Sequence, residues 1–259
     1  MKLHFLKFNP TENMTLLVTD PVPRALQGPL AARLMGNRSV GAEQVGYLEK
    51  ASLPGARARL QMMGGEFCGN ASMCMAVFLT RNELPPEGEK TVEIEVSGAG
   101  RVKCALRREG PDFRCRVEMP LPREIRRVGD LTLVRLPGIA HFVSQYPVDQ
   151  PEETLRKLAR GLEEDAVGLM QYLPEKGLTP LVYVKDTDTM VWERGCGSGS
   201  AAVGAMLASE TRGDVERRLP QPGGEIIVRG QWKETLSMLS IEGLVKIVCE
   251  GEACAEMGL

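Results

Sequence analysis

Two short segments with the same pattern, half a chain apart, constrain the fold more than any other feature of this sequence. Each places Cys-Gly at the start of a run of small and apolar residues: GNASMCMAVFLT follows Cys68, and GSGSAAVGAMLASE follows Cys196. The two cysteines lie 128 positions apart in a chain of 259 residues. A helix that is apolar on every side has to be buried. The pattern therefore predicts two similar lobes, each built around one buried helix that begins at a cysteine.

Alternating apolar and polar residues predict the strands around these helices. In the first half the strands fall near residues 4–8, 15–18, 44–49, 59–63, 91–96, 102–107 and 114–119, with an amphipathic helix over 24–35 that Gly36 ends. In the second half they fall near residues 131–136, 167–172, 181–184, 190–193, 225–229, 235–241 and 244–249, with a helix near 153–162. The order predicts an α+β fold of two pseudo-repeated lobes, each a mostly antiparallel mixed sheet wrapped around its apolar helix. The active site is expected in the cleft between the lobes.

The lobe boundaries follow from this repeat. Residues 1–122 form the expected N-terminal lobe, which carries Cys68, and residues 123–246 form the C-terminal lobe, which carries Cys196. The last strand, about 247–259, is expected to return to the N-terminal lobe.

Composition and charge narrow the classes of function. The formal net charge is −2 and the basic residues are scattered, so nothing builds the electropositive stripe that nucleic acid or an anionic membrane requires. No stretch approaches the roughly 20 apolar residues of a membrane span, and MKLHFLKFNP is too short and too interrupted for a secretory signal. We therefore expect a cytoplasmic protein with a small-molecule partner. Association into a homodimer is an option that the sequence leaves open.

The seven cysteines indicate thiols rather than a disulfide framework or a metal site. Their number is odd, none belongs to a CxxC motif, and the two histidines are far apart. A disulfide framework typically has paired cysteines, and a metal site typically has closely spaced Cys and His ligands. No metal is expected.

A cysteine at a helix start has a chemical use. The unpaired N–H groups there carry about half a positive charge, which binds anions and lowers the pKa of a thiol below its usual value of roughly 8.5. Gly69 and Gly197 let a substrate approach the backbone, and Asn70 and Ser198 are candidates to cap the helices or to bind a ligand. Such a site suits removal of the α-proton of an amino acid, because preorganised amides stabilise the charge that develops on the carboxylate.

Inversion at Cα requires one group to take a proton while a second group gives a proton to the opposite face. Two cysteines, one a thiolate and the other a thiol, provide both groups, and their titrations are then coupled. The sequence therefore predicts an isomerase, a racemase or epimerase independent of pyridoxal phosphate, with Cys68 and Cys196 as acid and base.

The motifs resemble those of a known superfamily. MGGEFCGNASM and ERGCGSGSAAVGA are similar to the paired Cys-Gly motifs of diaminopimelate epimerases, and FNPTENMTLLV, EQVGY, VSG, GIAHFV, VGLM and QPGGEIIV extend the similarity over almost the whole chain. The short lead-in to Cys196 and the sequence LVYVKDTDTMVWERGCGSGS most resemble cofactor-independent histidine racemases, which supply D-histidine to opine-type metallophore biosynthesis. Proline racemases share the short lead-in but lack Cys-Gly-Asn.

The resemblance implies a set of site residues in addition to the catalytic pair of Cys68 and Cys196. The expected substrate-binding residues are Asn13, Glu43, Gly69, Asn70, Glu193, Gly197 and Ser198. The resemblance implies that Glu43 binds the substrate ammonium or an imidazole, and that Glu193 pairs with the ammonium or with Arg194. Arg194 itself departs from the histidine racemase pattern. It implies no pyridoxal phosphate, metal or nicotinamide.

Other side chains receive no firm role from the sequence. His141 is either a hydrogen-bond donor behind the site or a structural group at the end of a strand. The sequence indicates a role in the site still more weakly for Gln44 and Ser97. QPGG at 221–224 is typical of a turn before a strand and is assigned no chemistry.

Several functions remain open beside histidine racemisation. The chain could be a diaminopimelate epimerase or a proline-type racemase on the same fold. A different class of function is a redox dithiol or a small-molecule binding protein, in which the two cysteines meet as a disulfide. Isomerisation of the phenazine-biosynthesis kind is disfavoured, because those relatives lack the cysteine pair.

Overall fold

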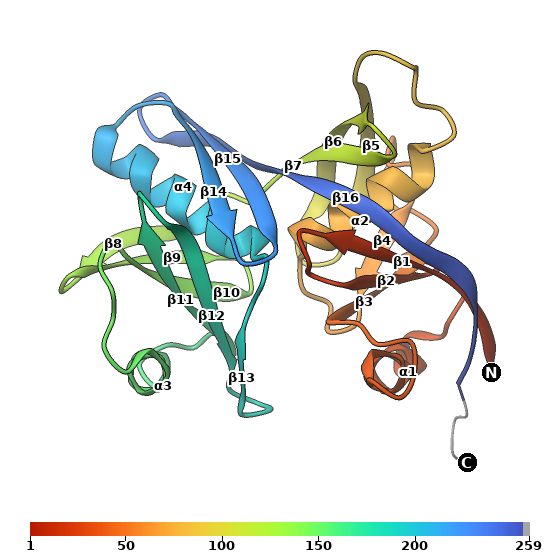
Figure 1. The fold of residues 1–259 in the computed structure, drawn as a ribbon, viewed down its shortest axis with the longest axis horizontal. Coiled ribbons are helices and arrows are strands. Elements are labelled where there is room, and N and C mark those ends of the chain that lie inside the picture. The colour runs from red at the N-terminus through yellow and green to blue at the C-terminus, as the bar shows by residue number, and fades with distance from the viewer. Residues whose placement is uncertain (256–259) are drawn as a thin grey trace. The chain divides into compact units, whose positions relative to one another are not determined.

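A computed structural model describes residues 1–255, which divide into two compact units (Figure 1). Unit 1 contains Met1–Val117 and residues 243–255, and unit 2 contains Glu118–Glu242. The last strand, β16 (Leu236–Cys254), begins in unit 2 and continues into unit 1. Among residues 1–255 no helix is long and apolar enough to cross a membrane.

Unit 1 is a mixed sheet with one helix inside it and one outside. Its elements are β1 (Lys2–Pro10), β2 (Thr15–Val18), α1 (Arg24–Met35), β3 (Gln44–Glu49), β4 (Arg59–Met62), α2 (Gly69–Thr80), β5 (Lys90–Val96), β6 (Gly100–Glu109), β7 (Asp112–Glu118) and the second part of β16. The strands neighbour one another in the order β1-β2-β3-β4-β5-β6-β7-β16, and β1 also pairs with β16, which closes the sheet. The pairs β2–β3 and β4–β5 are parallel, whereas β1–β2, β3–β4, β5–β6 and β6–β7 are antiparallel.

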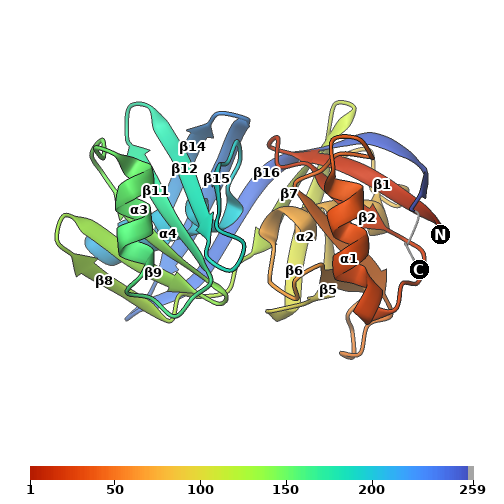
Figure 2. The ribbon, with the colours of Figure 1, turned by 90° about the horizontal axis from the view of Figure 1, so that it is seen from below.

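Helix α2 is the central helix of unit 1. It packs against β1, β2, β4, β5 and β6, and its residues from Gly69 through Val77 are all buried. Helix α1, in contrast, buries only Gln27, Leu30, Ala31 and Leu34 and lies on the outer face beside β3 (Figure 2). An all-round apolar sequence has therefore become a core helix, whereas α1, which is buried along one face only, covers a sheet.

Unit 2 also has one helix among its strands and one outside, but its strands belong to two sheets. Its elements are β8 (Glu124–Val128), β9 (Leu131–Leu136), β10 (Ile139–Ser144), α3 (Pro151–Ala159), β11 (Ala166–Leu173), β12 (Gly177–Val184), β13 (Thr189–Trp192), α4 (Gly197–Thr211), β14 (Val215–Gln221), β15 (Gly224–Trp232) and the first part of β16. Six strands form a sheet in the order β13-β12-β11-β10-β9-β8, in which β10 and β11 are parallel. Helix α4 packs against β8, β9, β10, β11, β14 and β15, and α3 lies outside against β11 and β12.

The predicted fold class is confirmed, and most predicted elements coincide with observed ones. The sequence missed β8, β10 and β14, and it divided β16 into two strands. Strands β8 and β14 are rich in exposed charged residues, and β14 contains Pro220, so neither shows the apolar alternation of a half-buried strand. Strand β10 is almost wholly buried and therefore does not alternate. Gly243 does not interrupt β16.

Candidate active site

Both cysteines occupy the N-cap position of their helices, in the same geometry. The backbone is extended at Cys68 (φ −132°, ψ 115°) and at Cys196 (φ −109°, ψ 107°). Each sulfur accepts a hydrogen bond from the backbone N–H three residues later, at 3.3 Å from Ala71 and 3.2 Å from Gly199. Of the two roles expected for Asn70 and Ser198, helix capping is wrong, because the thiols themselves accept from these N–H groups, whereas ligand binding stays a prediction.

The residues that follow each cysteine strengthen the repeat. The hydroxyls of Ser72 and Ser200 donate to the carbonyl oxygens of Cys68 and Cys196, each at 2.7 Å. Gly69 and Gly197 are the first helical residues, and both are buried. Each unit thus presents one cysteine at the positive end of a core helix, held by the same local hydrogen bonds.

The side chains around Cys68 form a line of hydrogen bonds within unit 1. The Cys68 thiol donates to Oε1 of Gln44 at 2.9 Å, and Nε2 of Gln44 donates to Oδ1 of Asn13. Nδ2 of Asn13 donates in turn to Oε2 of Glu43 at 3.1 Å. The structure therefore brings Asn13 and Glu43 together with Cys68, and adds Gln44, whose sequence signal was weak.

The start of the parallel pair β2–β3 places these side chains. Asn13 lies just before β2, and Gln44 is the first residue of β3. The backbone amides of Glu43 and Gln44 both donate to the carbonyl of Met14, at 2.8 Å and 3.3 Å. Because the two strands run in the same direction, their starting residues meet at one edge of the sheet, beside helix α2.

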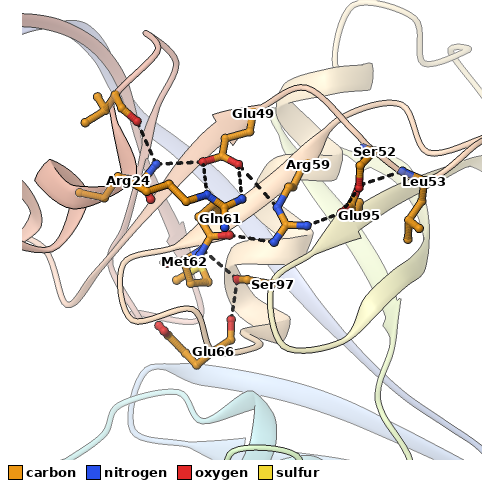
Figure 3. Close-up of polar contacts among 12 residues, drawn as sticks. Arg24, Glu49, Ser52, Leu53, Arg59, Gln61, Met62, Glu66, Glu95 and Ser97 are labelled. Atoms are coloured by element: carbon orange, nitrogen blue, oxygen red, sulfur yellow. Dashed lines mark hydrogen bonds and ion pairs between the residues drawn. The ribbon is translucent and has the colours of Figure 1, made fainter.

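The loop that leads to Cys68 rests on the end of strand β5 (Figure 3). The Ser97 hydroxyl donates to the carbonyl of Glu66 at 2.7 Å and accepts from the backbone N–H of Met62 at 2.9 Å. Gly98 has a φ of +73°, and a Cβ there would lie 2.6 Å from the backbone nitrogen of Phe67. Only glycine allows the two backbone segments to approach this closely.

An ion pair between the partly exposed Arg59 and the buried Glu95 lies near this loop support (Figure 3). The Arg59 guanidinium binds the Glu95 carboxylate and donates through Nη2 to Oε1 of Gln61 at 2.9 Å. Burial alone raises the pKa of Glu95, but hydrogen bonds from Ser52, Leu53 and Arg59 outweigh it and lower the pKa to about 2. Glu95 is therefore ionised and paired, as a buried charge has to be.

The surroundings of Cys196 differ from those of Cys68. The residue is only 3% exposed, and Glu193 is hydrogen-bonded to its thiol. Burial raises the pKa of Cys196 well above its usual range, and the charge of Glu193 raises it further, against smaller opposing effects of Ser198 and the Gly199 amide. For Cys196 the expectation of a lowered thiol pKa is wrong, because burial and the neighbouring Glu193 carboxylate outweigh the hydrogen bonds from Ser198 and the Gly199 amide.

His141 and Gln221 also reach this helix start. Nε2 of His141 lies 2.9 Å from the Ser198 hydroxyl, and burial lowers the pKa of His141 to about 3. Oε1 of Gln221 accepts from the backbone N–H of Cys196 at 2.8 Å, while its Nε2 donates to the Ser200 hydroxyl at 2.9 Å. The QPGG segment does form the turn between β14 and β15, but no local pattern indicated that Gln221 anchors the start of α4.

The predicted site residues fall into two groups by unit. Unit 1 holds Asn13, Glu43, Cys68, Gly69 and Asn70, and unit 2 holds Glu193, Cys196, Gly197 and Ser198. Each group is assembled around one cysteine at the start of one core helix. Each could bind a carboxylate through helix-start amides and exchange a proton through sulfur.

Comparison with known proteins identifies the family. The sequence-family model of the histidine racemase CntK N-terminal domain matches residues 2–254. The chain belongs to the histidine racemase family. Its relatives in this family include histidine racemases of Fusobacterium nucleatum (strain ATCC 25586), 30% identical over 96% of either chain, and of Staphylococcus aureus (strain Mu50), 30% identical over 98% of either chain.

More distant relatives extend the similarity to the superfamily. A diaminopimelate epimerase of Xanthomonas axonopodis pv. citri is 25% identical over 90% of this chain and 88% of its own. A hydroxyproline epimerase structure from Agrobacterium vitis aligns with a TM-score of 0.71 at 14% identity, covering 97% of this chain and 92% of that one. A predicted epimerase structure from Pseudomonas aeruginosa aligns with a TM-score of 0.74 at 12% identity, covering 98% and 100%. The resemblance drawn from the sequence is confirmed, and these structures share the fold of the histidine racemase family member described here.

Proposed function

We propose that this protein racemises histidine, with Cys68 and Cys196 as the two proton-transfer groups. The observation that carries the proposal is the duplicated geometry in a histidine racemase family member: both thiols cap core helices and accept the same backbone hydrogen bond. No other pair of cysteines in residues 1–255 has this arrangement.

The proposed chemistry uses one thiolate and one thiol. The thiolate takes the α-proton, so that its S–H bond forms as the Cα–H bond breaks. The other thiol then gives its proton to the opposite face of Cα, and the protein ends with the proton moved from one sulfur to the other. Between these steps, negative charge develops on the substrate carboxylate, and N–H groups at Gly69, Asn70, Gly197 and Ser198 are proposed to stabilise it.

Glu193 is proposed to couple substrate binding to the ionisation of Cys196. Its carboxylate opposes thiolate formation in the protein without substrate. A substrate ammonium that pairs with Glu193 offsets this negative charge, and so favours the Cys196 thiolate when an amino acid is present. Asn13 and Glu43 are proposed to contact the substrate from the Cys68 group.

Incubation with L-histidine in D2O tests the function. We expect deuterium at Cα and formation of D-histidine. A parallel screen of L-amino acids, including proline and LL-diaminopimelate, measures selectivity; exchange with another substrate in preference to histidine overturns the histidine assignment, and exchange with none overturns the racemase proposal.

Serine variants test the two-thiol mechanism. Cys68→Ser and Cys196→Ser should each abolish net inversion, because serine hydroxyl is far too weak an acid to replace the thiol. Cys249→Ser is the matched control, since Cys249 is exposed on β16, and it should keep full activity. Full activity in either Cys68→Ser or Cys196→Ser contradicts the proposal.

A further inference from the structure

The hydrogen bonds from Glu43 to Cys68 have a fixed direction. A carboxylate oxygen only accepts, so Asn13 has to present Nδ2 to Glu43, at 3.1 Å. Oδ1 of Asn13 then faces Gln44 and accepts from its Nε2. Oε1 of Gln44 is thereby turned toward Cys68, 2.9 Å from Sγ. An amide oxygen also only accepts. Oε1 of Gln44 therefore needs a donor, and the S–H group of Cys68 is that donor.

The backbone holds this line of side chains in place. The backbone N–H of Asn13 donates to the carbonyl of Pro10 at 3.1 Å, and the hydroxyl of Thr15 donates to the carbonyl of Asn13 at 3.0 Å. Asn13 is 6% exposed, so water has little access to the middle of the line. Rotating the Asn13 amide by half a turn would place its Nδ2 against Nε2 of Gln44 and its Oδ1 against the Glu43 carboxylate. Rotating the Gln44 amide would place its Oε1 against Oδ1 of Asn13, so that two acceptors would face each other.

We propose that Glu43, acting through Asn13 and Gln44, keeps the proton on Cys68 in the protein without substrate. Glu43 and Asn13 are positioning residues in this respect, because they act on the thiol through Gln44. The catalytic meaning rests on the proposed racemase function: the resting enzyme would carry Cys68 as its acid. After a turnover that leaves Cys68 as the thiolate, the same line favours return of the proton to it.

Other titratable groups in unit 1 also bear on Cys68. Cys74, six residues later on α2, is buried, and burial followed by the charge of Cys68 raises its pKa. Glu66 lies two residues before Cys68, and burial raises its pKa. Both groups stay in place when Glu43 is changed, so variants of Glu43 isolate the effect of the hydrogen-bonded line.

The rate of Cys68 alkylation by iodoacetamide, followed against pH by peptide mass spectrometry, tests the proposal on the full-length protein without substrate. Only the thiolate reacts, so the rate measures loss of the proton. Cys68 is partly exposed and Cys249 is exposed, which makes Cys249 an internal reference in the same sample. The measurement does not depend on racemase activity, so it separates failure of this inference from failure of the proposed function.

Two substitutions at the exposed residue Glu43 distinguish the line from a simple charge effect. Glu43→Gln removes both the charge and the fixed acceptor, whereas Glu43→Asp keeps the charge but withdraws the carboxylate by one methylene. We expect both variants to move the midpoint of Cys68 alkylation to lower pH and to raise its rate at neutral pH about fivefold, the size expected for one net hydrogen bond. Alkylation of Cys249 should not change.

A double variant tests whether Glu43 acts on Cys68 through Gln44. Gln44→Leu removes the acceptor next to sulfur and should give a similar shift, and Glu43→Gln added to it should have no further effect, since the connection is already broken. An effect of Glu43→Gln without an effect of Glu43→Asp shows that charge alone is responsible and overturns the proposal. So does an unchanged Cys68 profile in both Glu43 variants, or full additivity in the double variant.

Discussion

Nε2 of His141 lies 2.9 Å from the hydroxyl oxygen of Ser198, at the start of the helix that Cys196 caps. His141 is completely buried, and a Cβ on Gly168 would lie 2.2 Å from its Nδ1, so the ring packs directly against the β11 backbone. Burial lowers the pKa of His141 to about 3. The imidazole is therefore neutral near neutral pH, and it orients Ser198 without adding a positive charge to the site.

The neutral His141 predicts a pH-dependent stability. In the unfolded chain the ring takes up a proton near pH 6.5, whereas in the folded protein it does so only near pH 3. The unfolded state therefore binds the proton first, and stability falls as pH drops below 6.5. For this group alone the free energy of unfolding should fall by about 2 kcal/mol between pH 7.5 and pH 5.0.

Denaturant unfolding of the wild type and of His141→Gln at the two pH values checks this prediction. The variant should show a smaller loss of stability at pH 5.0, by about 2 kcal/mol. His4 and the carboxylates are common to both proteins and cancel in the comparison. Equal losses in both proteins would show that His141 titrates normally.

A second prediction concerns the ionisation of Cys196. Glu193→Gln removes the negative charge that, after burial, raises the pKa of the thiol, so the Cys196 thiolate should form at lower pH. Its ultraviolet absorbance, taken as the difference between each protein and its Cys196→Ser derivative, measures this. Glu175→Gln is the matched control, because Glu175 lies exposed on the turn between β11 and β12. If the Cys196 titration is not shifted in Glu193→Gln, the charge of Glu193 does not raise the pKa of Cys196.

The third prediction tests the support beneath the Cys68 loop. Ser97→Ala removes the donor to the Glu66 carbonyl and the acceptor of the buried Met62 amide. Leaving such a buried amide unpaired costs about 1–3 kcal/mol of unfolding free energy. The looser loop should also lower kcat. Ser237→Ala, which removes an exposed hydroxyl that donates to the Gln231 carbonyl, should change stability by less than about 0.5 kcal/mol. Equal effects of the two substitutions would contradict the proposed support.

The sequence predicted the elements whose pattern is local. The two core helices are apolar on every side, and the observed α2 and α4 begin directly after the predicted cysteines. Helix α1 ends before Gly36, as its sequence indicated. Strands β8 and β14 escaped prediction because their stability comes from pairing with β9 and β15, and their own residues are largely charged.

The site was only partly predictable for a related reason. Cys68 and Cys196 stood out because a rare local motif occurs twice. Gln44 lies 24 positions before Cys68, and Gln221 lies 25 positions after Cys196. Strand register brings these glutamines to the helix starts, and no spacing rule in one sequence encodes that meeting.

The ion pair of Arg59 and Glu95 could not be predicted for the same reason, because these residues meet through the parallel pair β4–β5.

The last prediction concerns the packing of helix α4, which carries Cys196. A Cβ on Gly204 would lie 2.3 Å from Cγ2 of Val228 on β15, and Val228 is fully buried. Alanine favours a helix over glycine by about 1 kcal/mol, but overpacking against a stiff β-branched side chain costs about 1–3 kcal/mol. Gly204→Ala should therefore lower the free energy of unfolding in the wild type and raise it in a Val228→Ala background, where the space is open. Denaturant unfolding of the four proteins measures this coupling, and a destabilisation of equal size in both backgrounds would show that the close approach of α4 to β15 is not what requires glycine.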